Sequence, residues 1–237
     1  MNNLQTCIVL AGGLGTRLRS AVPDKPKCLA PIGSKSFLET QLSMLSAQGF
    51  NNFIISVGYL SEMVIAEVVR LESLFKIQTA TEITPLGTGG AILSTMHSLG
   101  IVESVVANGD TFLDGDISSM RQPLDLANEE FARIAITHIA NRNRYGGVTI
   151  ENNRIKGFTE KGVADSGYIN AGVYRLHMSI FSHLQPGTAF SFENSILPRL
   201  INQNYLTGTA ISGDFTDIGV PEDYFRFLDK QLNTNAD

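Results

Sequence analysis

Short, continuously apolar segments alternate with segments of helical periodicity in the first half of the chain. The runs Cys7–Leu10 and Phe53–Val57 have the pattern of strands that are buried on both faces. Between them, apolar residues recur at helical spacing over 37–48. The pattern then predicts a helix capped by Ser61, followed by a strand, a helix and a strand at 76–80, 90–99 and 104–107. This alternation predicts a parallel sheet with helices on both faces.

The pattern changes between residues 121 and 205. This segment is typical of strands connected by short turns, at 133–139, 148–151, 154–158 and 168–176. Asn152 and Asn153 join two of them, and asparagine tolerates the positive φ of a tight hairpin. A helix begins at Pro221, with acidic residues in its first turn and Lys230 in its last. We therefore expect one α/β domain, in which 1–120 with 206–237 form one lobe and 121–205 form a mixed, partly antiparallel extension.

Composition and charge narrow the possible partners. The 237 residues are 43% hydrophobic and carry a formal net charge of −5, which disfavours binding to nucleic acid or to an anionic membrane surface. The two cysteines, Cys7 and Cys28, indicate neither a zinc site nor a disulfide framework. With no signal-peptide pattern and no membrane-spanning apolar run, we expect a soluble, cytoplasmic protein. A homo-oligomer is left open.

The stretch "LAGGLGTRLRSAVPDKPKCLAPI", from Leu10 to Ile32, follows the first predicted strand. Open α/β sheets bind ligands at this end of a strand, and glycines let backbone N–H groups converge on an anion. Arg17 can grip phosphate oxygens with a planar fork, while Lys27 is a compact positive charge. The segment therefore predicts a phosphate cradle, and the alternative is a tight glycine turn. The P-loop motif Gly-x-x-x-x-Gly-Lys-Ser/Thr is absent, and the dinucleotide fingerprint fails because position 18 is leucine and not glycine.

Three further segments contain a carboxylate that is a candidate for the site. Asp110 is the last residue of "ANGD", which ends an apolar predicted strand, and Asp217 lies in "DFTDIG" before the last helix. A carboxylate at the end of a strand beside a phosphate cradle is suited to Mg²⁺, whereas the alternative for Asp110 is an ordinary turn residue. Glu82 opens "EITPLGTGGA", where it either accepts hydrogen bonds from a guanine base or remains solvated at the start of a helix.

The glycines and cations together resemble a known signature. Gly12-Gly13-x-Gly15-Thr16-Arg17-Leu18, followed by Pro26-Lys27, is similar to the motif of the sugar-1-phosphate nucleotidylyltransferases. "VGY" (57–59) and "LGTGGAI" (86–92) resemble the group that acts on D-glycero-α-D-manno-heptose 1-phosphate with GTP. The resemblance covers most of the chain. It implies a Rossmann-like, glycosyltransferase-A-like fold and transfer of a nucleoside monophosphate to a sugar 1-phosphate, with release of pyrophosphate, for cell-surface glycan synthesis.

The resemblance also assigns roles to residues. It implies that Arg17 and Lys27 are catalytic and that Asp110 and Asp217 hold Mg²⁺. The nucleotide-binding residues that it implies are Leu10, Ala11, Gly12, Gly13, Gly15, Thr16, Arg17, Glu82, Pro85, Gly87, Thr88 and Asn108. The sugar-phosphate-binding residues are Gly109, Gly147, Glu160, Lys161, Asn170 and Gly172. The chain departs from the family pattern after Lys161, where Gly162 replaces the usual proline.

Other functions stay open at this point. One is a nucleotidylyltransferase of the same fold with another substrate, such as mannose 1-phosphate, glucose 1-phosphate, a polyol phosphate or molybdopterin. Another is a catalytically idle regulatory subunit that keeps the nucleotide-sugar pocket. Glu160-Lys161 and Asn170 favour a sugar phosphate over a polyol or molybdopterin, and the intact set of cations and aspartates favours an active enzyme.

Overall fold

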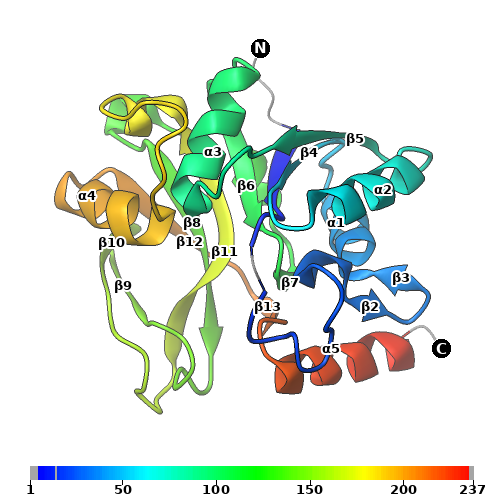
Figure 1. Ribbon diagram of the computed structural model, residues 1–237. Coiled ribbons are helices and arrows are strands. Elements are labelled where there is room, and N and C mark those ends of the chain that lie inside the picture. The colour runs from blue at the N-terminus through cyan, green and yellow to red at the C-terminus, as the bar shows by residue number, and fades with distance from the viewer. Residues whose placement is uncertain (1–4, 14, 235–237) are drawn as a thin grey trace. The chain divides into compact units, whose positions relative to one another are not determined.

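The computed structural model describes residues 5–13 and 15–234 and divides the chain into two compact units (Figure 1). The terminal unit comprises Gln5–Pro85, Ala107–Leu113 and the chain from Phe215 onward, and the middle unit comprises Leu86–Val106 and Asp114–Asp214. Three strands run across the boundaries between these segments: β6 (Glu103–Asn108), β7 (Thr111–Gly115) and β13 (Gly213–Asp217).

Parallel strands form the centre of the terminal unit. β1 (Thr6–Leu10) pairs in parallel with β4 (Asn52–Val57), which pairs in parallel with β5 (Lys76–Thr81). The apolar side chains of β1 and β4 are buried, apart from the half-buried Leu10 at the end of β1, as their hydrophobic runs predict. The remaining elements of this unit are η1 (Lys27–Leu29), the hairpin β2–β3 (Pro31–Ile32 and Lys35–Ser36), α1 (Phe37–Ala47), α2 (Ser61–Leu71) and α5 (Pro221–Thr234).

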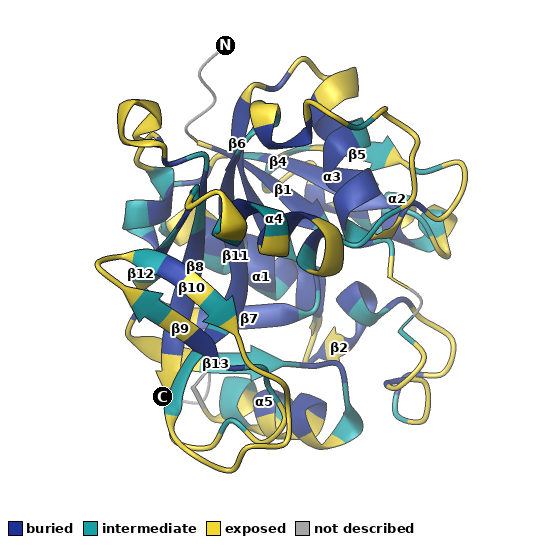
Figure 2. Cartoon of the chain, turned by 90° about the vertical axis from the view of Figure 1, so that its left-hand side faces the viewer, coloured by how far each residue is buried: buried dark blue, intermediate teal, exposed yellow. Residues whose placement is uncertain are grey.

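Mixed pairing characterises the middle unit. β11 (Gly167–His177) pairs antiparallel with β8 (Ala132–Ile139), and β12 (Leu206–Ala210) lies parallel on the other side of β8. β9 (Val148–Glu151) and β10 (Arg154–Phe158) form a hairpin that continues the sheet beyond β12. Most residues of β8 and of β11 are buried (Figure 2). The helices are α3 (Gly87–Ser98), η2 (Ser118–Arg121), η3 (Leu126–Asn128), η4 (Met178–Phe181), the π-helical η5 (Phe192–Ile196) and α4 (Leu197–Asn202).

The predicted α/β class is confirmed, with parallel strands in one unit and partly antiparallel strands in the other. Asn152 and Asn153 form the hairpin turn with φ values of 49° and 61°, as predicted. Two capping predictions are wrong. Leu60, in the left-handed region, is the N-cap of α2, so Ser61 is already helical, and Lys230 lies before the last turn of α5. No helix among the described residues is long and apolar enough to cross a membrane.

Candidate active site

One hydrophobic cluster of the terminal unit holds the neighbours of the predicted charged residues. Leu18 follows Arg17, Phe112 lies two residues after Asp110, and Ile218 follows Asp217. All three apolar residues belong to the same core cluster, in which Leu18 and Ile218 are 1% and 0% exposed. Phe37 and Phe227 complete the centre of the cluster, with ring centroids 5.6 Å apart. Burial of these neighbours therefore draws three segments that are distant in sequence to one place.

Lys27 and Asp110 form an ion pair. Nζ of Lys27 lies 2.8 Å from Oδ2 of Asp110, and the two side chains are 16% and 33% exposed. Lys27 begins η1, and its carbonyl accepts the backbone hydrogen bond of Ala30. Gly15 has a φ of 62°, and a Cβ there would lie 2.8 Å from Cγ of Lys27. A glycine is therefore needed both for the backbone conformation and for the passage of the lysine side chain.

Asp217 lies beside this pair. The backbone N–H of Ile218 donates to the carbonyl of Asp110 at 3.0 Å, and that of Gly219 donates to Oδ1 of Asp217 at 2.7 Å. Burial and the negative charge of Asp110 raise the pKa of Asp217, against the opposing effects of Gly219, Lys27 and Arg17. The structure thus brings together the four residues on which the predicted chemistry depends.

The donor set at this place suits a divalent cation such as Mg²⁺. Asp110 and Asp217 supply hard carboxylate oxygens. Burial is the larger cause of the raised pKa of Asp217, and repulsion by the negative charge of Asp110 adds to it. A cation between them would relieve that repulsion. Within the described residues there is no cluster of three or more potential side-chain ligands, so the remaining ligands would be water or substrate oxygens.

Gln41, which the sequence analysis missed, shapes the Asp110 turn. Its Nε2 donates to the carbonyl oxygens of Asn108 and Thr111, both at 2.8 Å, and the residue is only 2% exposed. The two carbonyls flank Asp110, so one amide fixes both ends of the turn. A buried polar residue on the apolar face of the predicted helix over 37–48 was the available signal, because such a group needs a partner.

The glycines of the opening loop lie next to two other strand ends. Gly12 accepts a hydrogen bond from the N–H of Tyr59, and Ala11 donates to Ser56. A Cβ on Gly12 would lie 2.6 Å from Oε1 of Glu82, so the carboxylate rests against the bare backbone. The structure thus places Glu82 beside the predicted nucleotide loop. Arg17, Thr16 and Gly13 are exposed.

Asn108 and Gly109 also belong to the terminal unit. The N–H of Gly109 donates to the carbonyl of Leu10 at 3.0 Å, which ties the Asp110 turn to the end of β1. Oδ1 of Asn108 is buried and accepts no hydrogen bond among the described residues.

Gly87 and Thr88 lie at the start of α3 in the middle unit, where packing also explains them. A Cβ on Gly87, whose φ is 67°, would lie 2.7 Å from the carbonyl oxygen of Phe190. The hydroxyl of Thr88 donates to Glu193 at 2.7 Å and accepts from the N–H of Phe192 at 2.9 Å. The glycine-rich start of α3 therefore admits the chain segment that ends at Phe192.

The predicted sugar residues of the middle unit converge around Gly147. This residue bridges Ile169, the neighbour of Asn170, and it exchanges hydrogen bonds with Thr159, the neighbour of Glu160. Oδ1 of Asn170 accepts from the N–H of Gly172 at 2.9 Å, and its Nδ2 donates to the hydroxyl of Tyr174 at 2.8 Å. Gly172, with a φ of 73°, lies in a bulge of β11.

The structure gives a reason for Gly162, the departure from the family pattern. Its φ is 101°, and its N–H donates to the carbonyl of Asn143 at 2.8 Å. Proline could provide neither, because its ring fixes φ near −65° and it has no N–H. The neighbouring Glu160 and Lys161 are both exposed.

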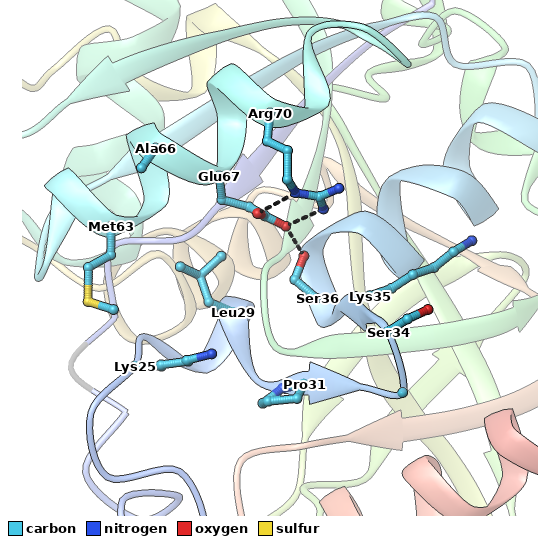
Figure 3. Close-up of a pocket in the computed structure, with 11 residues that line it drawn as sticks. Lys25, Leu29, Pro31, Ser34, Lys35, Ser36, Met63, Ala66, Glu67 and Arg70 are labelled. Atoms are coloured by element: carbon cyan, nitrogen blue, oxygen red, sulfur yellow. Dashed lines mark hydrogen bonds and ion pairs between the residues drawn. The ribbon is translucent and has the colours of Figure 1, made fainter.

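One pocket of the terminal unit is lined by none of the predicted site residues (Figure 3). Arg70 and Lys35 line it, and Arg70 pairs with Glu67 at 2.8 Å and also with Glu39. Ser36, the N-cap of α1, donates to Glu67 at 2.5 Å. Because its arginine is already neutralised by carboxylates, we assign this network to the packing of α1 against α2.

Comparison with known proteins shows which family the chain is similar to. The family described as nucleotidyl transferase matches residues 6–234. D-glycero-alpha-D-manno-heptose 1-phosphate guanylyltransferase of Campylobacter jejuni is 41% identical, covering 93% of this chain and 97% of its own. Its namesake from Aneurinibacillus thermoaerophilus is 36% identical, covering 95% and 97%. The crystal structure of HddC from Yersinia pseudotuberculosis aligns with a TM-score of 0.81 at 30% identity, covering 95% of this chain and 99% of that one, and HddC has also been crystallised with GMP-PN. The resemblance that begins in the opening loop is therefore confirmed, and the chain belongs to the nucleotidyl transferase family.

Proposed function

We propose that this enzyme transfers GMP from GTP to D-glycero-α-D-manno-heptose 1-phosphate and releases pyrophosphate. One observation carries the proposal: Lys27, Asp110 and Asp217 meet at the glycine loop, with Lys27 and Asp110 2.8 Å apart. Two relatives named for this activity, at 41% and 36% identity, support the choice of sugar and base. The product would be a nucleotide sugar for cell-surface glycans such as lipopolysaccharide or capsule, made in the cytoplasm.

The reaction depends on neutralising the negative charges of the phosphates more than on proton transfer. An oxygen of the sugar phosphate attacks the α-phosphorus of GTP, a new P–O bond forms, and the bond to the β-phosphate breaks with its electron pair leaving on pyrophosphate. The nucleophile is an anion at neutral pH, so no general base is needed. The barrier lies in bringing several negative charges together, and cations at fixed positions lower it.

Each charged candidate residue of the terminal unit has a role in this scheme. Lys27, held in η1, neutralises charge on the transferring phosphate, and Arg17 grips oxygens of the leaving group with its planar fork. Asp110 and Asp217 would hold Mg²⁺, which supplies charge neutralisation and alignment of the phosphate oxygens. The glycines before Arg17 admit the nucleotide close to the backbone, where Glu82 accepts hydrogen bonds from guanine.

The middle unit supplies the groups that bind the second substrate, the sugar 1-phosphate. Lys161 pairs with the sugar phosphate, and Glu160 accepts hydrogen bonds from sugar hydroxyls. Asn170 and the backbone at Gly172 and Gly147 border the ring. Both charged side chains are exposed and project from one loop, so they can reach a substrate.

A pyrophosphate-release assay tests the proposal. The purified chain is given GTP, ATP, CTP or UTP with Mg²⁺, each with heptose, mannose or glucose 1-phosphate. We expect GTP with the heptose phosphate to give the highest kcat/KM, and the Asp110→Asn variant serves as the inactive control. A higher kcat/KM for another pair would reassign the substrates within the family. Nucleotide binding with no turnover in any pair would instead establish a regulatory subunit.

A further inference from the structure

The loop that carries Glu160 and Lys161 has little to hold it in place. It connects β10 to β11, and each residue from Thr159 to Ser166 is exposed. A segment without buried side chains gains no packing energy that would fix its conformation. A loop that must present two charges to a substrate therefore needs other restraints.

Arg142 supplies the strongest of these restraints. Its Nε and Nη2 donate to the two carboxylate oxygens of Asp165, at 2.8 Å and 2.7 Å. Its backbone N–H donates to the carbonyl of Asp165, also at 2.8 Å. The guanidinium and the carboxylate are both planar, and two parallel hydrogen bonds join them. The pair therefore fixes the orientation of the two groups as well as the distance between them.

Two neighbouring bonds extend this contact along the loop. Gly162 donates to the carbonyl of Asn143, and Thr159 donates to that of Gly147, at 2.8 Å and 2.9 Å. Glu160 and Lys161 thus lie between two points that are tied to the same segment, 142–147.

The chain makes space for the arginine. A Cβ on Gly147 would overlap Nη1 of Arg142, and a Cβ on Gly167 would lie 2.9 Å from its Nε. The side chain is 14% exposed, so it runs largely covered to reach Asp165, which is 49% exposed. Gly147 therefore has a second use besides the predicted contact with the sugar.

We propose that Arg142 and Asp165 form a latch that positions Glu160 and Lys161 for the sugar 1-phosphate, so Arg142 is a positioning residue for the second substrate. The inference rests on the proposed function of that loop. An exposed ion pair adds little to global stability, but a small displacement of a binding group has a large effect on catalysis. The latch should therefore affect the sugar substrate far more than the nucleotide.

The test compares steady-state constants for both substrates in matched variants. Arg142→Met should raise the KM for D-glycero-α-D-manno-heptose 1-phosphate about tenfold, while the KM for GTP changes by less than about twofold. Arg142→Lys, which keeps the charge but loses the fork, should show much of this effect. Asp165→Asn should reproduce it, and the double variant Arg142→Met/Asp165→Asn should be no worse than either single variant.

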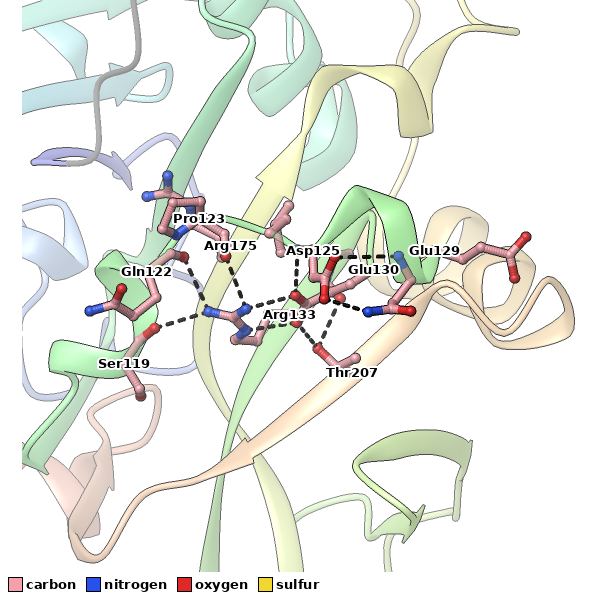
Figure 4. A network of polar contacts seen from close by, with 12 residues as sticks. Ser119, Gln122, Pro123, Asp125, Glu129, Glu130, Arg133, Arg175 and Thr207 are labelled. Atoms are coloured by element: carbon pink, nitrogen blue, oxygen red, sulfur yellow. Dashed lines mark hydrogen bonds and ion pairs between the residues drawn. The ribbon is translucent and has the colours of Figure 1, made fainter.

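Arg133 is the control. It pairs with Glu130 at 2.7 Å and donates to the carbonyls of Ser119 and Gln122 (Figure 4). It lies near the start of β8, whereas Arg142 follows the end of that strand. Arg133→Lys should lower the melting temperature without changing the ratio of the two KM values.

The failure of the latch and the failure of the proposed function give different results. If Lys161→Ala raises the KM for the sugar phosphate but Arg142→Met and Arg142→Lys do not, the latch is rejected while the binding role of the loop stands. If Lys161→Ala leaves that KM unchanged, the proposed role of the loop is wrong, and the latch proposal falls with it. Equal increases in both KM values for the Arg142 variants would indicate a general structural role and also overturn the latch.

Discussion

The two units of this protein hold their candidate functional residues by different physical means. In the terminal unit, Arg17, Asp110 and Asp217 lie within two residues of side chains that are buried in one core. A backbone hydrogen bond joins the turns of Asp110 and Asp217, and an ion pair joins Lys27 to Asp110. In the middle unit, Glu160 and Lys161 project from a loop in which each residue is exposed. An ion pair and two backbone hydrogen bonds tie that loop to the segment 142–147.

This difference has a functional logic. Groups that meet the reacting phosphates must be preorganised, and a packed core provides that rigidity. Groups that receive a second substrate must also admit it and release the product, for which loops of lower local stability are suited. Substitutions in the terminal unit should therefore act on turnover, and those in the loop should act on the KM for the sugar phosphate.

The largest expected effect is that of Asp110→Asn. The amide keeps the size of the carboxylate but removes its charge, so turnover that depends on Mg²⁺ should be abolished. Rates measured against Mg²⁺ concentration, with Asp24→Asn from the exposed part of the opening loop as control, test this. An unchanged dependence on metal would argue against Asp110 as a ligand.

Lys27→Ala should follow, with turnover reduced by about 10²–10³-fold, the usual scale for one electrostatic donor. The matched control is Lys25→Ala, which removes an exposed lysine two residues away. Stopped-flow or steady-state pyrophosphate release gives the comparison. Near-normal turnover in Lys27→Ala would remove this residue from the proposed mechanism.

Gln41→Met tests whether the buried amide supports the Asp110 turn. The variant leaves two buried carbonyls without a donor, so the free energy of unfolding should fall by about 1–3 kcal/mol. Because Asp110 lies between those carbonyls, kcat should also fall, by about tenfold. Denaturant unfolding and turnover are measured beside Gln48→Met, at the C-cap of the same helix. A stability loss with normal kcat would limit Gln41 to a structural role.

The smallest expected effect comes from the ion pair of Glu67 and Arg70, which lines the pocket of the terminal unit shown in Figure 3. The hydrogen bond from Arg70 is the main reason why the pKa of Glu67 lies below its usual range. Burial acts in the opposite direction, and the hydrogen bond from Ser36 lowers the pKa further. Such a carboxylate stabilises the fold above its unfolded pKa of about 4.3, and the contribution is lost as the pH falls through the lowered folded value.

Glu67→Gln should therefore cost about 0.5–1 kcal/mol at pH 7, a value reduced by the exposure of Arg70. The difference from the unsubstituted protein should vanish once the pH lies below the lowered pKa. Urea unfolding across this range gives the measurement, with Glu62→Gln, an exposed position of α2, as control. A difference that persists at low pH would mean that the hydrogen-bonded shape of Glu67, and not its charge, stabilises the helices.

The sequence predicted the elements and the local motifs well because both depend on short-range patterns. The apolar runs gave β1 and β4, and the Asn152-Asn153 pair gave the hairpin between β9 and β10. The opening loop alone was sufficient for recognition of the family. Ser61 was misassigned because the left-handed Leu60 takes the N-cap position, and a left-handed leucine has no sequence signal.

What could not be predicted depends on pairings between distant residues. The bonds of Gln41 to the turn at 108–111 and of Arg142 to Asp165 connect side chains that no periodicity relates. Gly147 was marked only as a family position and Gly162 only as a departure from the family pattern. Their geometry explains Gly147 as room for an arginine and Gly162 as a backbone donor with positive φ. A single sequence shows such residues, but it does not show what they meet.

The core cluster of the terminal unit unites Leu18 near the start of the chain with Ile218 and Phe227 near its end, and the hydroxyl of Tyr224 binds the carbonyl of Pro31. During synthesis on a ribosome, the opening loop therefore emerges long before the residues that must pack against it. Nascent chains that lack β13 and α5 should consequently be inert toward nucleotide, so the order of translation delays activity until these two elements have been synthesised.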